Sequence, residues 1–290
     1  MELGELFDRG FRIWKDNVKV GFLFLAGSLL SWIPILIFVA FLLYLIGTEA
    51  IWVALHYHSE AEVMSILKAY ALPIVSVFIL SMIASFVVYE FFRLAAIRAC
   101  SLSIDGRMEF GAAIEFAKRR LLTMIGAEIL RYIALLAPLT LLIASFLYPS
   151  PLLVLFLGLI GLILSVFLGI LLVYVPYAVA EGYGAVESIK ASYSVARRKL
   201  LETVVIIIVV ILIHAACRMI SEFSIYTATF SFYAYSHAPS CTPLYTPALA
   251  SLGATLIISI ILVSFVAQPL AAIFYLLFFR ENVSDLGQLE

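Results

Sequence analysis

Six long apolar stretches fill most of this chain of 290 residues, and short polar segments separate them. A helix needs about 20 apolar residues to cross a bilayer core of roughly 30 Å. Six stretches meet that length, and we expect transmembrane helices over residues 20–46, 70–97, 121–147, 152–180, 200–220 and 248–279. The pattern predicts an all-α polytopic membrane protein with a single integral membrane domain over residues 1–290.

The composition agrees with this pattern. Hydrophobic residues make up 64% of the chain and charged residues 13%, and the mean hydropathy is +1.13. A soluble domain carries about 45–50% apolar and roughly 25% charged residues, so a soluble globular domain is excluded. The net charge of −1 provides no electrostatic basis for binding nucleic acid. The chain has only two Asn and two Gln, a scarcity typical of thermophile proteins and also of membrane composition.

The positions of Lys and Arg predict the orientation. Fifteen of the 18 basic residues fall in the segments that would share one side of the membrane: before the first span, around 93–120, around 181–199, and at Arg280. Cytoplasmic loops carry such an excess. We therefore expect a plasma-membrane protein with both termini in the cytoplasm. The apolar run after Lys19 is too long for the core of a signal peptide, so no cleavable signal is expected.

Proline occurs inside four of the six predicted spans, at Pro34, Pro138, Pro176 and Pro269. Proline lacks the backbone N–H that a continuous helix uses, and a helix bundle tolerates the resulting kink where neighbouring groups satisfy the freed carbonyl. We expect the helices to kink at these positions.

The segments before the odd-numbered spans share one design. Apolar residues recur at helical spacing over 2–17, 107–120 and 184–199, which predicts three amphipathic helices lying at the cytoplasmic interface. Their basic residues would face the anionic lipid of the inner leaflet. The last two segments also match in letters, since AKRRLL at 117–122 parallels ARRKLL at 196–201, and each follows an acidic residue and a glycine, Asp105-Gly106 and Glu181-Gly182. These matches predict a threefold repeat of an amphipathic helix and a transmembrane hairpin.

A family resemblance rests on the second of these segments. Residues Pro176–Tyr193, PYAVAEGYGAVESIKASY, are closed by Arg197-Arg198-Lys199-Leu200. This run resembles the cytoplasmic signature of a diffuse six-span superfamily, which includes the membrane domain found beside glycerophosphodiester phosphodiesterases and the YciC-like proteins. The resemblance implies an accessory or transport-like membrane module, and it carries no catalytic residues to this chain.

Ionisable residues inside a membrane are costly and usually face a bundle interior or a watery cavity. Glu128 and Arg131 lie one helical turn apart in the third span, and Glu90 and Arg93 form a similar pair in the second. Glu202 lies low in the fifth span. These five residues are candidates for a polar cavity facing the cytoplasm. A structural ion pair and interface anchoring of Arg131 are the alternatives.

Other candidates lie toward the outer side. His214, Arg218 and Glu222 recur every four residues and predict a polar stripe, either a helix end closed by a salt bridge or a substrate or proton site. Cys217 and Cys241 could form a disulfide, and two free thiols are the alternative. The aromatic and proline-rich outer loop 221–247 would fold onto the outer surface or bind a partner. His56, His58, Glu60 and Glu62 alternate, but the residues that follow look helical, so a metal site is not expected.

Function is less well determined by the sequence. No nucleotide-binding loop, zinc-protease motif or serine-hydrolase motif occurs, so we expect no catalytic residues, cofactor or metal. The leading hypothesis is a non-enzymatic transport or translocation module, or a membrane component of a larger envelope complex. A lipid-shaping scaffold is the first alternative and a lipid-headgroup enzyme the second. The sequence does not indicate an oligomeric state.

Overall fold

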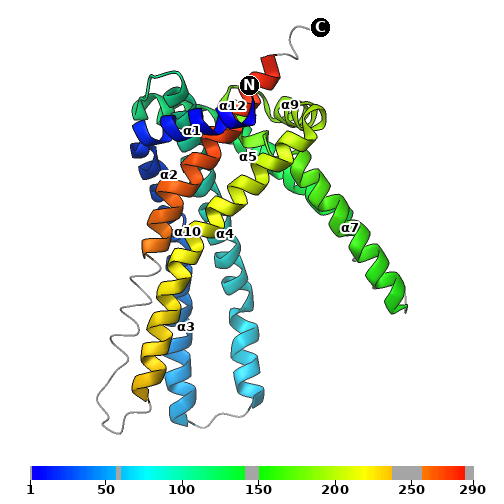
Figure 1. The fold of residues 1–290 in the computed structure, drawn as a ribbon. Helices are drawn as coiled ribbons and strands as arrows, with labels where there is room; N and C mark the ends of the chain where they lie inside the picture. The colour runs from blue at the N-terminus through cyan, green and yellow to red at the C-terminus, as the bar shows by residue number, and fades with distance from the viewer. Residues whose placement is uncertain (1, 57–59, 141–149, 237–256, 285–290) are drawn as a thin grey trace. The chain divides into compact units, whose positions relative to one another are not determined.

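The computed structural model describes residues 2–56, 60–140, 150–236 and 257–284. Within them the chain forms helices and turns and contains no strand (Figure 1). The helices are α1 Leu3–Asp16, η1 Val18–Val20, α2 Gly21–Leu30, α3 Ile33–His56, α4 Glu60–Ile104, α5 Phe110–Leu136, η2 Ala137–Leu139, α7 Pro151–Leu171, α8 Val175–Ala180, α9 Ala185–Arg198, α10 Leu200–Ser236, the π-helical turn η3 Val263–Ala267 and α12 Gln268–Ser284.

Six helical stretches of the described chain are long and apolar enough to cross a membrane: Val18–Leu45, Ala71–Ile104, Phe110–Leu139, Pro151–Ala180, Leu200–Met219 and Ile257–Val283. Large apolar side chains point outward along them; in α7, Leu152, Leu155 and Phe156 are all more than half exposed. In water such a surface would cause aggregation, whereas lipid solvates it. The chain is a multi-pass integral membrane protein with an all-α fold, as the hydropathy pattern predicts.

Two local expectations differ from the structure. Residues 107–120 do not form a separate helix, because α5 begins at Phe110 and continues without a break to Leu136. The separate helices expected over 2–17 and 184–199 are α1 and α9. Residues 221–236, expected as loop, continue α10 to Ser236, since no proline interrupts this aromatic stretch before Pro239.

Two of the four prolines follow real interruptions of the spans. Pro34 lies in the first turn of α3 after the turn at 31–32, and Pro176 lies in the first turn of α8 after the turn at 172–174. Proline is favoured there because the first N–H groups of a helix have no partner within the helix. Pro138 and Pro269 lie where the helix type changes without a break, in the 3-10 turn η2 and directly after the π-helical turn η3. Pro73, by contrast, lies inside the continuous helix α4.

Contacts divide the chain into two compact units, residues 1–25 with 93–290, and residues 26–92. In the second unit, the end of α2, α3 and the first part of α4 pack together. The Phe38 and Phe78 rings lie 5.3 Å apart, and Ser85 Oγ donates to the carbonyl of Ser31 at 2.6 Å. Gly27 lets the Phe92 side chain approach the backbone, since a Cβ at that position would lie 2.8 Å from Phe92 Cβ.

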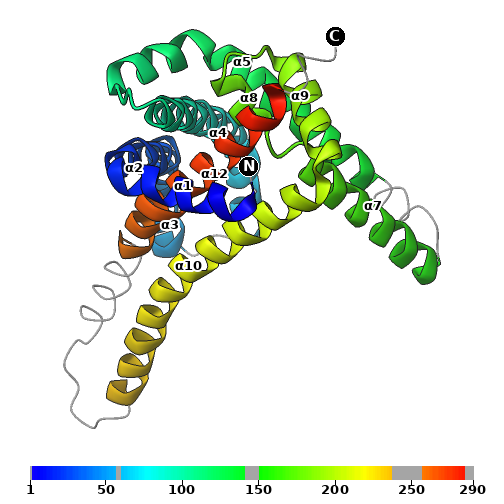
Figure 2. The ribbon, with the colours of Figure 1, turned by 45° about the horizontal axis from the view of Figure 1, so that its top comes forward.

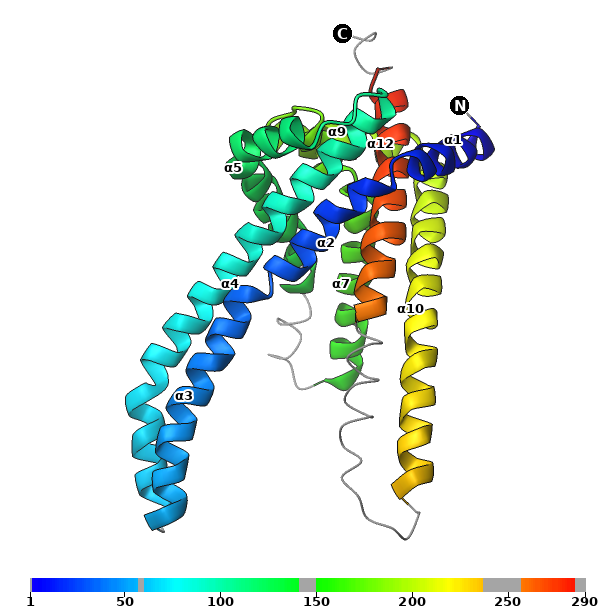
Figure 3. The ribbon, with the colours of Figure 1, turned by 90° about the vertical axis from the view of Figure 1, so that its left-hand side faces the viewer.

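The first unit contains the densest core. Helix α12 contributes a run of buried residues from Leu270 to Phe279, and α8 is buried over its whole length. Helices α8 and α9 lie against α5 (Figure 2), and α10 runs beside α12 (Figure 3). Helix α1 packs across α12, with the Phe274 ring occupying the place where Gly10 lacks a side chain, and Trp14 Nε1 donates to the carbonyl of Phe265 at 2.8 Å.

One end of this unit gathers the turns and most of the basic residues. It carries α1, the turns at 105–109 and 181–184, and Arg280, and we call it the basic end (Figure 1). Two turns there have the same backbone. Gly106 and Gly182 adopt positive φ angles of 69° and 102°. In each, the next residue donates back to a helix carbonyl, Arg107 to Leu102 and Tyr183 to Ala178, as in the Schellman motif that ends many helices.

Candidate functional site

A fully buried carboxylate is the first feature of the site. Glu128 lies on α5 with its side chain 0% exposed, between two arginines. Arg93 Nη1, from α4, lies 3.0 Å from Glu128 Oε1. Arg131 Nη1, one turn further along α5, lies 3.0 Å from the same oxygen and 3.1 Å from Oε2. The predicted pairing of Glu128 with Arg131 is present, and Arg93 joins it from a second helix.

The two arginines are less enclosed than the carboxylate. Their side chains are 19% and 22% exposed for Arg93 and Arg131. Nε of Arg131 is nevertheless buried and has no hydrogen-bond partner. Buried hydrogen-bond donors almost always have an acceptor. A guanidinium carries five N–H groups, each of which can donate to an acceptor. Arg131 therefore has an N–H available to an acceptor that the protein itself does not supply.

Two tyrosines lie near the Arg93–Glu128–Arg131 ion pairs. The rings of Tyr177 on α8 and Tyr275 on α12 lie 5.0 Å apart. Arg93 and Arg131 lie near enough to Tyr177 for their charges to act on its hydroxyl, and Arg131 acts on Tyr275 in the same way. We call Arg93, Glu128, Arg131, Tyr177 and Tyr275 the charged centre. It brings together four helices and pairs cationic groups with neutral hydroxyls that can donate or accept hydrogen bonds.

The segment Pro176–Tyr193 occupies a central position beside the charged centre. Tyr174, just before it, is fully buried, and its hydroxyl lies 3.2 Å from Thr203 Oγ1. Ser192 Oγ accepts from the Tyr174 backbone N–H at 3.1 Å and donates to the Leu171 carbonyl at 2.9 Å. These bonds satisfy the backbone at the break between α7 and α8, so a serine in α9 compensates for a helix interruption 18 to 21 residues earlier.

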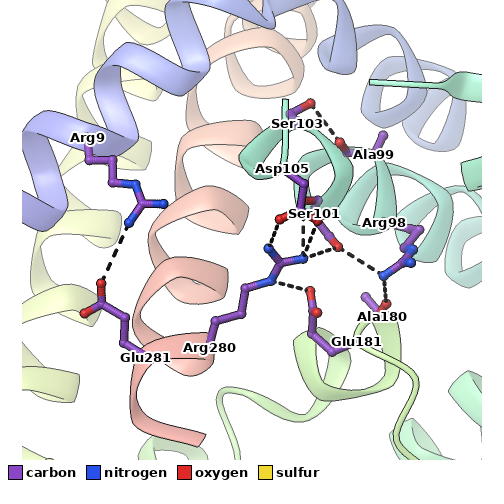
Figure 4. Close-up of polar contacts among 10 residues, drawn as sticks. All are labelled: Arg9, Arg98, Ala99, Ser101, Ser103, Asp105, Ala180, Glu181, Arg280 and Glu281. Carbon is purple, nitrogen blue, oxygen red and sulfur yellow. Dashed lines mark hydrogen bonds and ion pairs between the residues drawn. The ribbon is translucent and has the colours of Figure 1, made fainter. Parts of the chain in front are cut away.

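A second charged network closes the basic end (Figure 4). Arg280 donates through Nη1 to Asp105 Oδ1 at 2.8 Å and through Nη2 to Ser101 Oγ at 2.8 Å, and its Nε lies 3.0 Å from Glu181 Oε1. The Arg280–Glu181 pair is an ion pair whose atoms are not aligned for a hydrogen bond. The two acidic residues that precede the turn glycines thus converge on one cation.

Arg98 extends this network on α4. Its Nη1 donates to Ser101 Oγ at 3.1 Å and to the carbonyl of Ala180 at 3.0 Å, and its guanidinium lies 4.7 Å from the centre of the Phe116 ring. Cations are favoured beside the last carbonyls of a helix. Arg98 and Arg280 therefore join the end of α4 to the ends of α8 and α12.

Glu90 and Glu202 complete the predicted polar cavity. Glu90 is buried and belongs to the second unit, so a pocket shared by Glu90 and Glu128 stays a prediction. Glu202 is 37% exposed at the start of α10 and pairs with Lys199 at 3.5 Å. It therefore has a partner on its own helix turn and is separate from the Glu128 ion pairs.

The outer candidates are described only in part. His214 Nδ1 lies 2.9 Å from the carbonyl of Val210 on its own helix, and Arg218 follows it on α10, while the side chain of Glu222 lies outside the described residues. Cys217 is a buried free cysteine and Cys241 lies outside the described residues, so their pairing stays a prediction. The loop residues 237–247 also lie outside.

Metal ligands do not converge within the described residues. There, no group of three or more His, Cys, Asp or Glu side chains is placed to hold a metal ion. His58 and the side chains of His56, Glu60 and Glu62 lie outside the described residues.

The role of Arg280 is not evident from the sequence, where this residue is one member of the basic tail and Asp105-Gly106 and Glu181-Gly182 mark a repeat. The available signal was the pair of acidic residues at equivalent turns, both of which pair with Arg280. Tyr177 and Tyr275 carried no sequence signal, because tyrosine is common throughout this chain.

A scan against protein-family models, a search of curated proteins and a search of solved structures each find no match to this chain. Its function is therefore inferred from its own geometry.

Proposed function

We propose that this protein is a plasma-membrane transport or translocation module, with its basic end in the cytoplasm, in which the charged centre contacts a polar substrate. The observation that carries the proposal is the buried Glu128 carboxylate held between Arg93 and Arg131 inside an apolar span. Ionisable groups at that depth typically mark the path of a polar substrate. The buried Nε of Arg131, which has no hydrogen-bond partner, supports the same interpretation, because it can bind an acceptor from the substrate.

The arrangement of the charged centre also allows a substrate anion to exchange with Glu128 at one of the arginines. Glu128 accepts from two guanidinium groups on different helices, so a substrate anion can replace it at one of them while the other bond holds. Guanidinium groups bind carboxylate and phosphate through paired N–H bonds. Tyr177 and Tyr275 add hydroxyls that suit a neutral polar portion of the same molecule.

A scaffold is the second candidate, and the network at the basic end favours it. Arg98 and Arg280 tie three helix ends together through several charge-assisted bonds, as a static framework requires. The enzyme alternative has less support. The two carboxylates that converge at the basic end, Asp105 and Glu181, both pair with Arg280 and are not poised for acid–base chemistry.

The transport and scaffold proposals differ in whether water reaches the part of α5 beyond the charged centre. Leu135 lies one turn beyond Arg131 on the same helical face, whereas Ile133 is an exposed apolar residue on α5 that lipid would cover. We expect Leu135→Cys, in a background with all three native cysteines replaced, to react with a membrane-impermeant thiol reagent in reconstituted vesicles. Ile133→Cys should stay unreactive.

An unreactive Leu135→Cys would contradict the proposal and favour the scaffold. Equal reaction of both positions would also contradict it, since water would then reach a face assigned to lipid. Arg107→Cys, at the exposed turn of the basic end, serves as the positive control for labelling.

A further inference from the structure

A pocket opens at the basic end, between the end of α4 and the first turns of α5. Its volume is about 230 Å³. Six residues line it: Arg98, Leu102, Ala112, Glu115, Phe116 and Arg119. Two of the six are arginines, one is acidic and three are apolar, which is a mixed lining suited to an anionic group attached to an apolar body.

Arg98 is held ready for a ligand. Its Nη1 is occupied by Ser101 Oγ and the Ala180 carbonyl, and its plane rests near the Phe116 ring. Among the described residues no other group accepts a hydrogen bond from Arg98. The N–H groups of its Nη2 and Nε therefore remain available to a ligand. A guanidinium fixed in this way loses little side-chain entropy when it binds, and its fork of donors matches two oxygens of a phosphate.

Arg119 supplies a second cation that can move onto a ligand. It pairs with Glu115 one turn earlier on α5, but both side chains are more than 60% exposed. Exposed pairs of this kind contribute little, since water and salt compete with them. Because the Arg119–Glu115 pair is weak, a phosphate that also binds Arg98 competes well with the Glu115 carboxylate for Arg119. The segment 107–120 has four basic and two acidic residues, which also favours an anion.

The surroundings favour a ligand that comes from the membrane. The pocket lies where the second span ends, at Ile104, and the third span begins, at Phe110. Apolar residues near it on α5 are exposed, with Ile114 at 38% and Leu122 at 83%. Acyl chains can lie along this surface while the headgroup reaches the arginines. A free phosphate would gain nothing from these apolar residues.

We propose that this pocket binds the phosphate group of an anionic phospholipid headgroup, with Arg98 and Arg119 as its ligands. Lipid bound there would fix the α4–α5 turn to the inner leaflet. This site is separate from the charged centre, and its existence does not depend on the transport role.

Native mass spectrometry of the purified protein tests the site, by titration with phosphatidylglycerol in detergent and with phosphatidylcholine as the zwitterionic control. Arg119→Gln should weaken phosphatidylglycerol binding about tenfold, because it removes charge-assisted bonds to the phosphate. Lys118→Gln removes the same charge from the adjacent exposed position, which does not line the pocket, and should change binding less than about twofold. Arg119 is exposed, so neither variant should alter thermal unfolding of the lipid-free protein.

Equal weakening by the two variants would overturn the proposal, since it would show attraction to general surface charge. Equal binding of phosphatidylcholine would overturn it as well. Inorganic phosphate and glycerol 3-phosphate distinguish the source of the ligand. We expect neither to compete at the lipid concentration used, and competition by inorganic phosphate alone would assign the pocket to a free phosphate.

Discussion

At the scale of single residues, burial separates the ion pairs that matter to this fold from those that do not. Glu128 is fully buried between two guanidinium groups, whereas Glu202 is 37% exposed beside Lys199. Removing one partner of a buried pair leaves an uncompensated charge, which is far more costly than losing a pair that water can solvate. The two glutamates therefore form a matched comparison within one protein.

Glu128→Gln should lower the free energy of unfolding by about 3 kcal/mol, because two arginines lose their anionic partner in an apolar span. Glu202→Gln should lower it by less than about 1 kcal/mol. Thermal unfolding in a single detergent, followed by intrinsic tryptophan fluorescence, measures both. Similar shifts for the two variants would show that the Glu128 ion pairs contribute no more than a surface pair.

At the scale of helices, close approach depends on glycine at specific positions. A Cβ at Gly161 would lie 2.7 Å from the carbonyl oxygen of Pro138, which belongs to the backbone of η2. At Gly169, two turns further along the same helix, the nearest atom would be Leu135 Cδ2 at 3.8 Å, an ordinary contact. Hydropathy treats the two glycines alike, and only the packing of α7 on η2 distinguishes them.

Gly161→Ala should destabilise the protein by about 1–3 kcal/mol, since α7 must move away from η2. Gly169→Ala should be neutral or stabilise it by about 0.5–1 kcal/mol through the better helix propensity of alanine. Denaturation of the two variants in the same detergent gives the comparison. A destabilisation by Gly169→Ala as large as that by Gly161→Ala would refute the close contact.

The exact helix boundaries are a feature that the sequence predicts only in part. The four prolines indicated kinks. Pro34 and Pro176 begin new helices, as local stereochemistry favours, whereas Pro138 and Pro269 lie where the helix type changes without a break. The sequence could not show whether 107–120 and 184–199 end before the following span. Residues Phe110–Leu136 form one helix, whereas α9 ends at Arg198 and α10 begins at Leu200. That difference depends on how each segment packs in the fold.

At the scale of the whole molecule, the orientation in the membrane follows from charge. Most basic residues belong to the segments of the basic end, and Arg9, Asp105, Glu181 and Arg280 lie there in ion-pair networks. Because cytoplasmic segments carry the excess of Lys and Arg, we expect this end to face the cytoplasm. Ser150, at the start of α7, should then face outward.

Ser150→Cys should react with an impermeant thiol reagent in intact cells, and Arg107→Cys only after the membrane is permeabilised. Both positions are exposed in the structure, so burial does not limit either reaction. The cysteine-free chain is the control for background labelling. Labelling of both variants in intact cells would refute the orientation and the six-span topology together.

The sequence by itself determined the class of this protein, the number and approximate place of its spans, and the pairing of Glu128 with Arg131. Those features depend on hydropathy, charge and helical spacing, which are properties of local segments. Tertiary structure decided that Arg93 joins Glu128 and that Asp105 and Glu181 share Arg280. It also decided that Arg98 and Arg119 line one pocket. These contacts join residues far apart in the chain, and only helix packing brings them together.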